Sequence, residues 1–319
     1  MSSAMPSGIS KLCDRLTALP QYLLPKRQVT RWAGSVATSR ARWTRRLIPW
    51  FIARYGVDMT EAADPDPLHY ATFNEFFTRA LRPGSRPIAA AQFISPVDGQ
   101  VVQYGRIEGD QLLQAKGHRY SVCALLAGEA ALAESFRDGT AVTLYLSPRD
   151  YHRIHMPCDG RLLGMTYVPG SLFSVNPATV RGVPGLFTRN ERVICLFDAA
   201  TGPFVMTLIG ATIVGGIATT WHGSVNPQRS ADIRKWRYAD DPVELRRGEE
   251  MGRFFIGSTV VMLFTAGTLR LRTDWTPGRR VRLGEPMVLA ACPESGAGDG
   301  NRTHVSRPAL LTGSITWEW

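Results

Sequence analysis

Short apolar runs separated by Gly, Pro and Asp fill the chain from about residue 87 onward. Runs of this length that are rich in β-branched and aromatic residues and end at turn residues predict β-strands. We therefore expect a mainly antiparallel β core. The runs expected to form strands are 101–102, 141–146, 161–168, 193–197, 204–209, 212–218, 256–264 and 281–283.

The first 86 residues have a helical pattern instead. Helices are expected between about residues 10 and 55, with breaks or kinks at Pro20, Pro25 and Pro49 because proline interrupts helical hydrogen bonding. Another helix is expected over 72–80, where Thr72 and Glu75 have the spacing of a capping box.

The predicted fold class is α+β, with an N-terminal helical module followed by the β core. The predicted divisions are a helical, basic region at 1–86, a β-rich core at 87–292 and a tail at 293–319. The tail lacks clear periodicity and contains a Gly-rich stretch, so we expect it to be disordered. A chain of 319 residues is long enough to bury a sizeable core.

The five cysteines argue against a disulfide framework. They are odd in number, widely spaced and include no C-x-x-C pair, which also disfavours a thiolate zinc site and fits a reducing compartment. They are Cys13, Cys123, Cys158, Cys195 and Cys292.

Positive charge is concentrated near the N-terminus. Residues 1–60 hold ten Lys or Arg against two Asp, a net charge of +8 out of +10 for the whole chain. Large apolar residues, among them Trp32, Trp43 and Trp50, are interleaved with these cations. The pattern is typical of a surface that rests on anionic lipid.

This basic segment has three other interpretations. Nucleic-acid binding is disfavoured because the segment is rich in Trp and aliphatic residues and matches no nucleic-acid module. A mitochondrial transit peptide and amphipathic helices with solvated basic faces are the alternatives. No spanning helix is expected, since the uncharged window 202–221 is rich in Gly and Thr and suits strands, and no secretory signal is apparent.

A serine lies inside an uncharged stretch, in Gly257-Ser258-Thr259. Taken alone, a Gly and a small polar residue in a buried strand indicate a bulge or a close backbone approach. Asp98, in Pro96-Val97-Asp98-Gly99, taken alone indicates a turn.

The segment 146–157 adds two histidines. Ser147 and Asp150 can close a short capped turn around Pro148, which would present Tyr151 and His152. His152 and His155 have His-x-x-His spacing, but the Glu of H-E-x-x-H is missing and flanking prolines leave little room for a helix. A serine, two imidazoles and a carboxylate are the groups that activate a weak oxygen nucleophile.

These segments resemble the phosphatidylserine decarboxylase family, the pyruvoyl-dependent, self-cleaving enzymes that make phosphatidylethanolamine, in its bacterial type. The resemblance runs from about Leu23 to Leu289. Pro49 is a departure, because it falls where the family pattern would continue a helix, and residues 293–319 do not match the family's ending. Its further landmarks are 72–77, 114–118, 167–170, 190–194 and 210–215.

The resemblance implies a self-processing triad of Asp98, His155 and Ser258. Neutral His155 would accept the Ser258 proton, while Asp98 would fix the imidazole tautomer and stabilise the imidazolium. Attack on Gly257 and cleavage at 257/258 would leave a β chain, 1–257, and an α chain, 258–319, that begins with a pyruvoyl group made from Ser258.

The resemblance further implies that this pyruvoyl cofactor forms a Schiff base with phosphatidylserine and serves as an electron sink. His152 would assist decarboxylation or reprotonation. The expected enzyme is a homodimer with no metal, peripheral on the cytoplasmic face of the bacterial cell membrane. A metal-dependent hydrolase using both histidines and a lipid-binding module that no longer cleaves are the alternatives.

Overall fold

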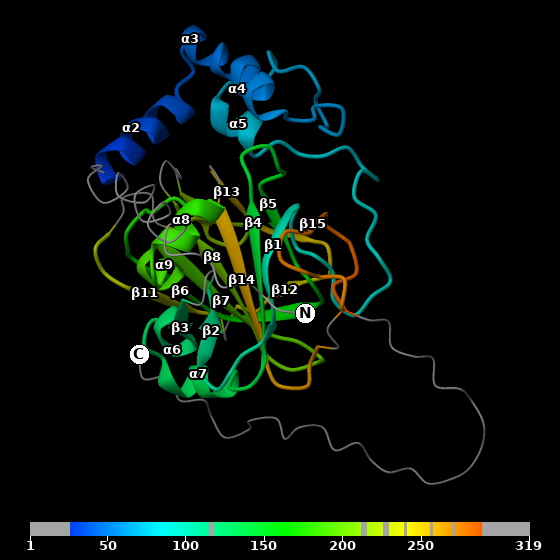
Figure 1. The fold of residues 1–319 in the computed structure, drawn as a ribbon. Coiled ribbons are helices and arrows are strands. Elements are labelled where there is room, and N and C mark those ends of the chain that lie inside the picture. Colours follow the sequence, from blue (N-terminus) through cyan, green and yellow to red (C-terminus); the bar gives the residue numbers. More distant parts are fainter. Residues whose placement is uncertain are drawn as a thin grey trace, which may run out of the picture.

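The computed structural model describes residues 26–288 except 115–117, 212–215, 226–229, 239–240, 256–257 and 270–271. Within this part, the helices before residue 78 gather at one end of the molecule and strands form its centre (Figure 1). The helices expected before residue 26 and the tail expected at 293–319 lie outside the described residues.

Three helices follow one another at the N-terminal end: α2 (Lys26–Thr38), α3 (Arg42–Arg45) and α4 (Leu47–Tyr55). The interruption expected at Pro49 falls at Arg46 instead. Pro49 occupies the first turn of α4, where its missing N–H has no intrahelical acceptor, while its ring would clash with the carbonyl four residues earlier. The chain therefore breaks between α3 and α4.

The predicted cap at Thr72 is confirmed in α5 (Phe73–Phe77), but the return bond from Glu75 reaches the residue before the cap and not the cap itself. Thr72 Oγ1 accepts from the N–H of Glu75 at 3.1 Å, and the Glu75 carboxylate accepts from the N–H of Ala71 at 2.9 Å. The helix is shorter than the predicted 72–80. Its Phe76 and Phe77 are buried with Ile48 of α4, which joins the two helices.

The predicted antiparallel core is confirmed as one large sheet. Its order is β11-β6-β7-β8-β14-β4-β1-β15, with β12 beside β6, and all of these pairings are antiparallel. The strands are β1 (Gly99–Arg106), β4 (Thr140–Leu146), β6 (Gly160–Val168), β7 (Arg192–Asp198), β8 (Phe204–Ile209), β11 (Arg234–Arg237), β12 (Val243–Leu245), β14 (Ser258–Phe264) and β15 (Arg280–Val281).

A smaller sheet covers one face of the large one, in the order β10-β9-β13-β5. Its strands are β5 (Arg153–His155), β9 (Ile217–Thr219), β10 (Gly223–Ser224) and β13 (Glu250–Phe254), and a separate hairpin pairs β2 (Gln111–Leu113) with β3 (Arg119–Ser121). The other face carries α6 (Val122–Leu125), α7 (Ala130–Ser135), α8 (Pro177–Gly182) and α9 (Leu186–Arg189).

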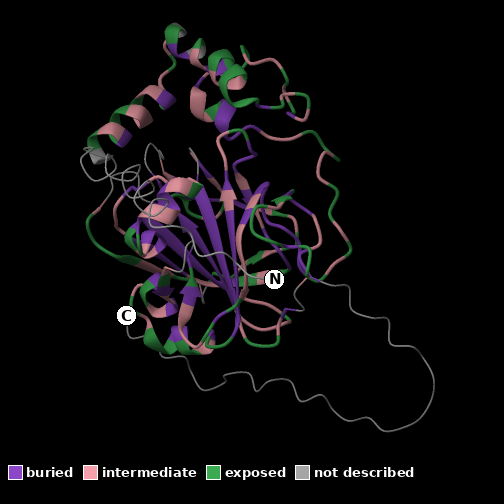
Figure 2. Cartoon of the chain, in the orientation of Figure 1, coloured by how far each residue is buried: buried purple, intermediate pink, exposed green. Residues whose placement is uncertain are grey.

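Side-chain alternation along β14 divides the core into two layers. Val260, Met262 and Phe264 pack in the cluster shared with the small sheet, whereas Val261 and Leu263 pack in the cluster shared with the helices. The central strands are consequently buried on both faces (Figure 2). By the same alternation, Ser258 lies on the side of the small sheet.

The close approach of β1 to β4 generates a test of this packing. A Cβ added to Gly99 would lie 2.5 Å from the carbonyl oxygen of Tyr145, whereas one added to Gly105, on the same strand, would meet nothing within 4 Å. Gly99→Ala should therefore destabilise the fold by about 1–3 kcal/mol. Gly105→Ala, the matched control, should stay within about 0.5 kcal/mol of wild type. Thermal unfolding of both variants measures the difference, and equal midpoints would contradict the close approach.

Candidate functional site

Ser258 is the first residue of β14 and is fully buried. Its Oγ forms no hydrogen bond with any described part of the chain. Ser258 lies opposite Leu146, the last residue of β4. A serine hydroxyl without a partner in this setting is costly to keep, because burial removes its hydrogen bonds to water.

Neighbouring strands bring the other predicted segments to the same end of the sheet. β4 lies between β14 and β1, with Tyr145 paired to Thr259 on one side and to Gln100 on the other. Asp98 directly precedes β1, and the histidine segment follows β4. Ser258, Asp98 and the histidine segment therefore meet where these three strands begin or end.

The predicted turn after β4 is confirmed. The Asp150 carboxylate accepts from the N–H of Ser147 at 2.8 Å and from its hydroxyl at 2.6 Å, while the N–H of Asp150 returns a bond to the Ser147 carbonyl. Arg280 of β15 donates to the second oxygen of Asp150. These bonds fix the start of the segment that carries both histidines.

His152 is fully buried after this turn. Its Nδ1 donates to the carbonyl of Asp150 at 2.8 Å, so the neutral ring keeps its lone pair at Nε2, which has no hydrogen-bond partner within the described chain. The Phe77 ring lies 4.1 Å away, centroid to centroid. Burial lowers the pKa of His152 to about 4, which keeps the ring neutral near pH 7.

His155 lies on β5 and has the same tautomer. Its Nδ1 donates to the carbonyl of Gly248 at 2.8 Å, and its Nε2 accepts from the hydroxyl of Tyr151 at 3.1 Å. Burial lowers the pKa of His155 and raises that of Tyr151 to about 12. Both histidines are therefore neutral acceptors at Nε2, the state that a general base requires.

Asp98 has a different partner from the expected one. One of its oxygens accepts from Arg86 Nε and from the N–H of Leu283, both at 2.9 Å, and the other accepts from Arg86 Nε and Nη2. Arg86 also donates to Glu61 at 2.7 Å. The expectation that Asp98 fixes the His155 tautomer is wrong for this structure, because the Gly248 carbonyl holds Nδ1 and Arg86 holds the carboxylate.

Asp98 and His155 nevertheless lie in adjacent segments. The N–H of His155 donates to the carbonyl of Pro96 at 2.9 Å, two residues before Asp98. The negative charge of Asp98 is one of the influences that favour protonation of His155, although burial outweighs it. Asp98 can therefore act on the imidazolium through its charge, without a direct hydrogen bond.

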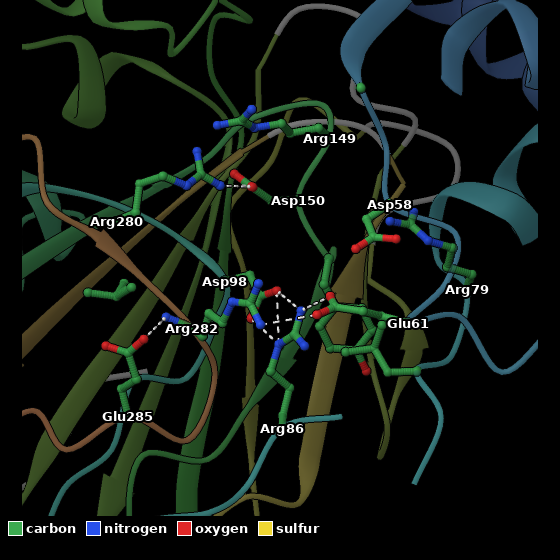
Figure 3. Close-up of a pocket in the computed structure, with 14 residues that line it drawn as sticks. Asp58, Glu61, Arg79, Arg86, Asp98, Arg149, Asp150, Arg280, Arg282 and Glu285 are labelled. Atoms are coloured by element: carbon green, nitrogen blue, oxygen red, sulfur yellow. Dashed lines mark hydrogen bonds and ion pairs between the residues drawn. The ribbon is translucent and has the colours of Figure 1, made fainter. Parts of the chain in front are cut away.

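A polar cleft of about 480 Å³ opens beside these residues (Figure 3). Asp98, Asp150 and Tyr151 line it from the β core, and Gly56, Asp58 and Glu61 line it from the segment after α4. Its wall includes the arginines Arg79, Arg86, Arg149, Arg280 and Arg282. The cleft therefore lies between the N-terminal segment and the end of the sheet.

Sequence reasoning missed the arginines of this cleft, Glu61 and Gly248. No local spacing marks them, because Arg86 reaches Asp98 and Gly248 reaches His155 only through the fold. Within the described ranges, no three His, Cys, Asp or Glu residues form a group that could hold a metal ion.

Comparison with known proteins gives matching family models. The model described as "Phosphatidylserine decarboxylase" matches residues 73–289, and a second, described as "PSD", matches residues 16–56. The first match alone covers more than half of the 319 residues and contains Asp98, both histidines and Ser258.

Curated relatives agree with the models. The chain is 62% identical over 276 residues to a phosphatidylserine decarboxylase proenzyme of Albidiferax ferrireducens, covering 86% of this chain and 97% of the relative. It is 61% identical over 282 residues to the proenzyme of Methylibium petroleiphilum, covering 88% and 99%. The corresponding protein of Dechloromonas aromatica is 59% identical over 277 residues, covering 86% and 98%.

Burial of His152 predicts a dependence of stability on pH. Its pKa falls from an ordinary 6.5 to about 4 on folding, so the unfolded chain binds the proton more tightly between these values. The contribution of neutral His152 to the free energy of unfolding is fully present above pH 6.5, and on the order of 3 kcal/mol of it is lost as pH falls to about 4. His152→Gln removes this loss. Urea unfolding at pH 7.5 and 4.5, with both proteins in a Ser258→Ala background, measures it; equal pH dependence would contradict a neutral buried His152.

Proposed function

The chain belongs to the phosphatidylserine decarboxylase family, and we infer that it converts phosphatidylserine to phosphatidylethanolamine after cleaving itself between Gly257 and Ser258. The observation that carries this proposal is the buried Ser258 hydroxyl, without a partner in the described chain, at the first residue of β14. Gly257, the residue it would attack, lies outside the described residues.

In the proposed cleavage, Ser258 Oγ attacks the carbonyl carbon of Gly257 and the peptide C–N bond breaks, which leaves an ester and a free Ser258 amine. A base then takes the Cα proton of Ser258, and the Cβ–O bond breaks to release the Gly257 carboxylate. Water hydrolyses the resulting enamine, through its imine tautomer, to ammonia and a ketone. The products are the chains 1–257 and 258–319, the second with a pyruvoyl terminus.

We propose that the Ser258 hydroxyl transfers its proton to Nε2 of His155. The Nδ1 of this ring donates a hydrogen bond to the Gly248 carbonyl, which fixes the tautomer. The Tyr151 hydroxyl, which donates to Nε2, must release it first. Asp98 stabilises the imidazolium through its charge, and Arg86 orients Asp98. This arrangement keeps the roles of a triad while replacing its usual carboxylate–imidazole hydrogen bond.

His152 is assigned to the decarboxylation step. Its Nε2 lone pair is buried and lacks a partner in the described residues, so it can accept a proton from the substrate's ammonium group and return it to the carbon that loses carbon dioxide. The position of Ser258 fits the pyruvoyl group, which supplies an electron sink for that carbon. The apolar surroundings strip water from the departing carboxylate.

We further propose that the N-terminal helices dock on the cytoplasmic face of the membrane. Trp32 on α2, Trp43 on α3 and Trp50 on α4 are 70%, 56% and 59% exposed, and the exposed Arg40 and Arg46 lie between them. Such a mixture of cations and indole rings suits an anionic bilayer surface. In the described part of the chain, no helix has both the length and the apolar character to cross a bilayer. The homodimer stays a prediction.

Self-cleavage is tested by removing the nucleophile. Ser258→Ala should remain a single full-length chain, because no oxygen remains to attack Gly257, and Asp98→Asn and His155→Ala should be processed at least tenfold more slowly. His152→Ala should cleave normally and lose at least tenfold in decarboxylation. Intact mass measurement of the purified proteins, with an assay of released carbon dioxide, checks all four.

Thr207→Val is the matched control for this experiment. Thr207 is equally buried on β8, beside β14, and its hydroxyl also lacks a partner in the described chain. Removing this hydroxyl should not affect self-cleavage, so Thr207→Val should still yield two chains. Two chains from Ser258→Ala would refute the mechanism, and a block in His152→Ala would reverse the roles of the two histidines.

Membrane docking is tested with two variants of the helices. Replacing Arg31, Arg40, Arg46 and Arg54 by Gln should weaken binding to anionic vesicles roughly tenfold or more at 0.1 M salt, because each cation contributes about 1 kcal/mol near the surface. Replacing the three tryptophans by Ser should weaken binding at 1 M salt as well, where charge is screened within about 3 Å. Vesicle sedimentation at both salt concentrations measures each effect.

Leu113→Ser is the control for the tryptophan variant. Leu113 is 51% exposed on β2, and this strand lies at the end of the molecule away from the N-terminal helices (Figure 1). It should bind vesicles as wild type does, and all variants should still cleave. Unchanged vesicle binding by the helix variants would remove these helices from the docking surface.

A further inference from the structure

Arg79 is a buried cation without an anionic partner. It follows α5, is 4% exposed and lines the cleft. Its Nε has no hydrogen-bond partner, and its guanidinium enters no ion pair within the described residues. Its guanidinium carbon lies 5.3 Å from the centre of the Phe76 ring.

Burial of an unpaired guanidinium is unfavourable. It lowers the pKa of Arg79, because the charged form loses its hydration. An unpaired buried guanidinium therefore lowers the stability of the folded protein. An anion that enters the cleft and pairs with the guanidinium offsets this loss of stability.

The carboxylates of the cleft are committed elsewhere. Asp98 and Glu61 bind Arg86, and Asp150 binds Arg280. Asp58 accepts from the hydroxyl and N–H of Thr60. Figure 3 shows the Arg79 guanidinium directed toward Asp58, yet the two side chains form no ion pair. Arg149, at the rim, is a second arginine of the cleft without an ion-pair partner in the described chain.

Arg79 is also close to the proposed reaction centre. Phe77, two residues earlier, packs its ring on His152, and the carbonyl of Thr78 accepts from Arg153 Nε at 2.8 Å. The charge of Arg79 is among the influences that lower the pKa of His152, after burial. An anion bound at Arg79 would therefore lie beside the group that handles the substrate's amine.

We propose that Arg79, with Arg149 at the rim, binds the phosphodiester of the phospholipid headgroup. This rests on the proposed function, since the headgroup must place its amine near Ser258 and His152. A phosphodiester stays on the lipid through decarboxylation, whereas the serine carboxylate leaves. Arg79 therefore serves substrate and product alike, and the carboxylate remains in the apolar part of the site.

The experiment uses short-chain dihexanoyl lipids below their micelle concentration. Calorimetry measures the Kd of dihexanoyl phosphatidylethanolamine for the unprocessed Ser258→Ala protein, with and without Arg79→Gln, so that this arm needs neither cleavage nor activity. Steady-state assays of the processed enzyme measure KM and kcat for dihexanoyl phosphatidylserine. Arg79→Lys tests rescue by charge, and Arg106→Gln, an exposed arginine at the far end of β1, is the control.

Arg79→Gln should raise both the product Kd and the substrate KM roughly 10- to 100-fold, with kcat close to wild type and processing intact. For Arg79→Lys, both constants should lie between those of wild type and Arg79→Gln, and for Arg106→Gln they should match wild type. Without ligand, Arg79→Gln should be at least as stable as wild type.

An unchanged product Kd in Arg79→Gln overturns the proposal. If the substrate KM alone rises, Arg79 binds the serine carboxylate instead. If wild type neither cleaves nor decarboxylates, the proposed function fails, while the calorimetry still decides the subsite. A less stable Arg79→Gln with wild-type affinities would assign Arg79 to structure.

Discussion

The antiparallel register of β14 between β4 and β8 is the constraint on which the site depends. It sets Ser258 opposite Leu146 and directs its side chain to the layer that contains β5 and β13. A slip of one residue would turn Ser258 toward the helices and bring Thr259 to the histidines. Every residue of β14 is buried, and each large apolar side chain contributes roughly 1.5–3 kcal/mol, so such a slip is strongly disfavoured.

The buried polar atoms that lack partners in the described chain include Ser258 Oγ, His152 Nε2 and Arg79 Nε. Each costs about 1–3 kcal/mol of stability. Buried threonine hydroxyls of the sheet share this condition, so a missing partner alone does not identify a reactive group. The distinction lies in orientation. His152 is fixed at Nδ1 by a carbonyl and on its face by Phe77, which leaves one nitrogen for chemistry.

The sequence predicted the antiparallel core, the cap at Thr72 and the Ser147–Asp150 turn, because each depends on periodicity or on partners within a few residues. It did not predict short strands such as β5 and β13, which are too brief to show a period. It also predicted a carboxylate–imidazole contact that is wrong. The true partners of Asp98 and His155 are Arg86 and Gly248, 12 and 93 residues away in sequence, and no local rule selects them.

The partner of Asp98 also changes how the N-terminal segment relates to the core. Arg86 binds Glu61 and Asp98 together, and Phe77 of α5 packs on His152, so contacts from the helical region form part of the site itself. These contacts cross the boundary expected at residue 86. Burial of Phe77 and the paired charges of Arg86 hold the two parts together more firmly than surface ion pairs would. A lipid headgroup that enters the cleft therefore meets residues of both parts, because the segment that follows directly after α4, the last of the helices that would dock on the membrane, forms one wall of the cleft.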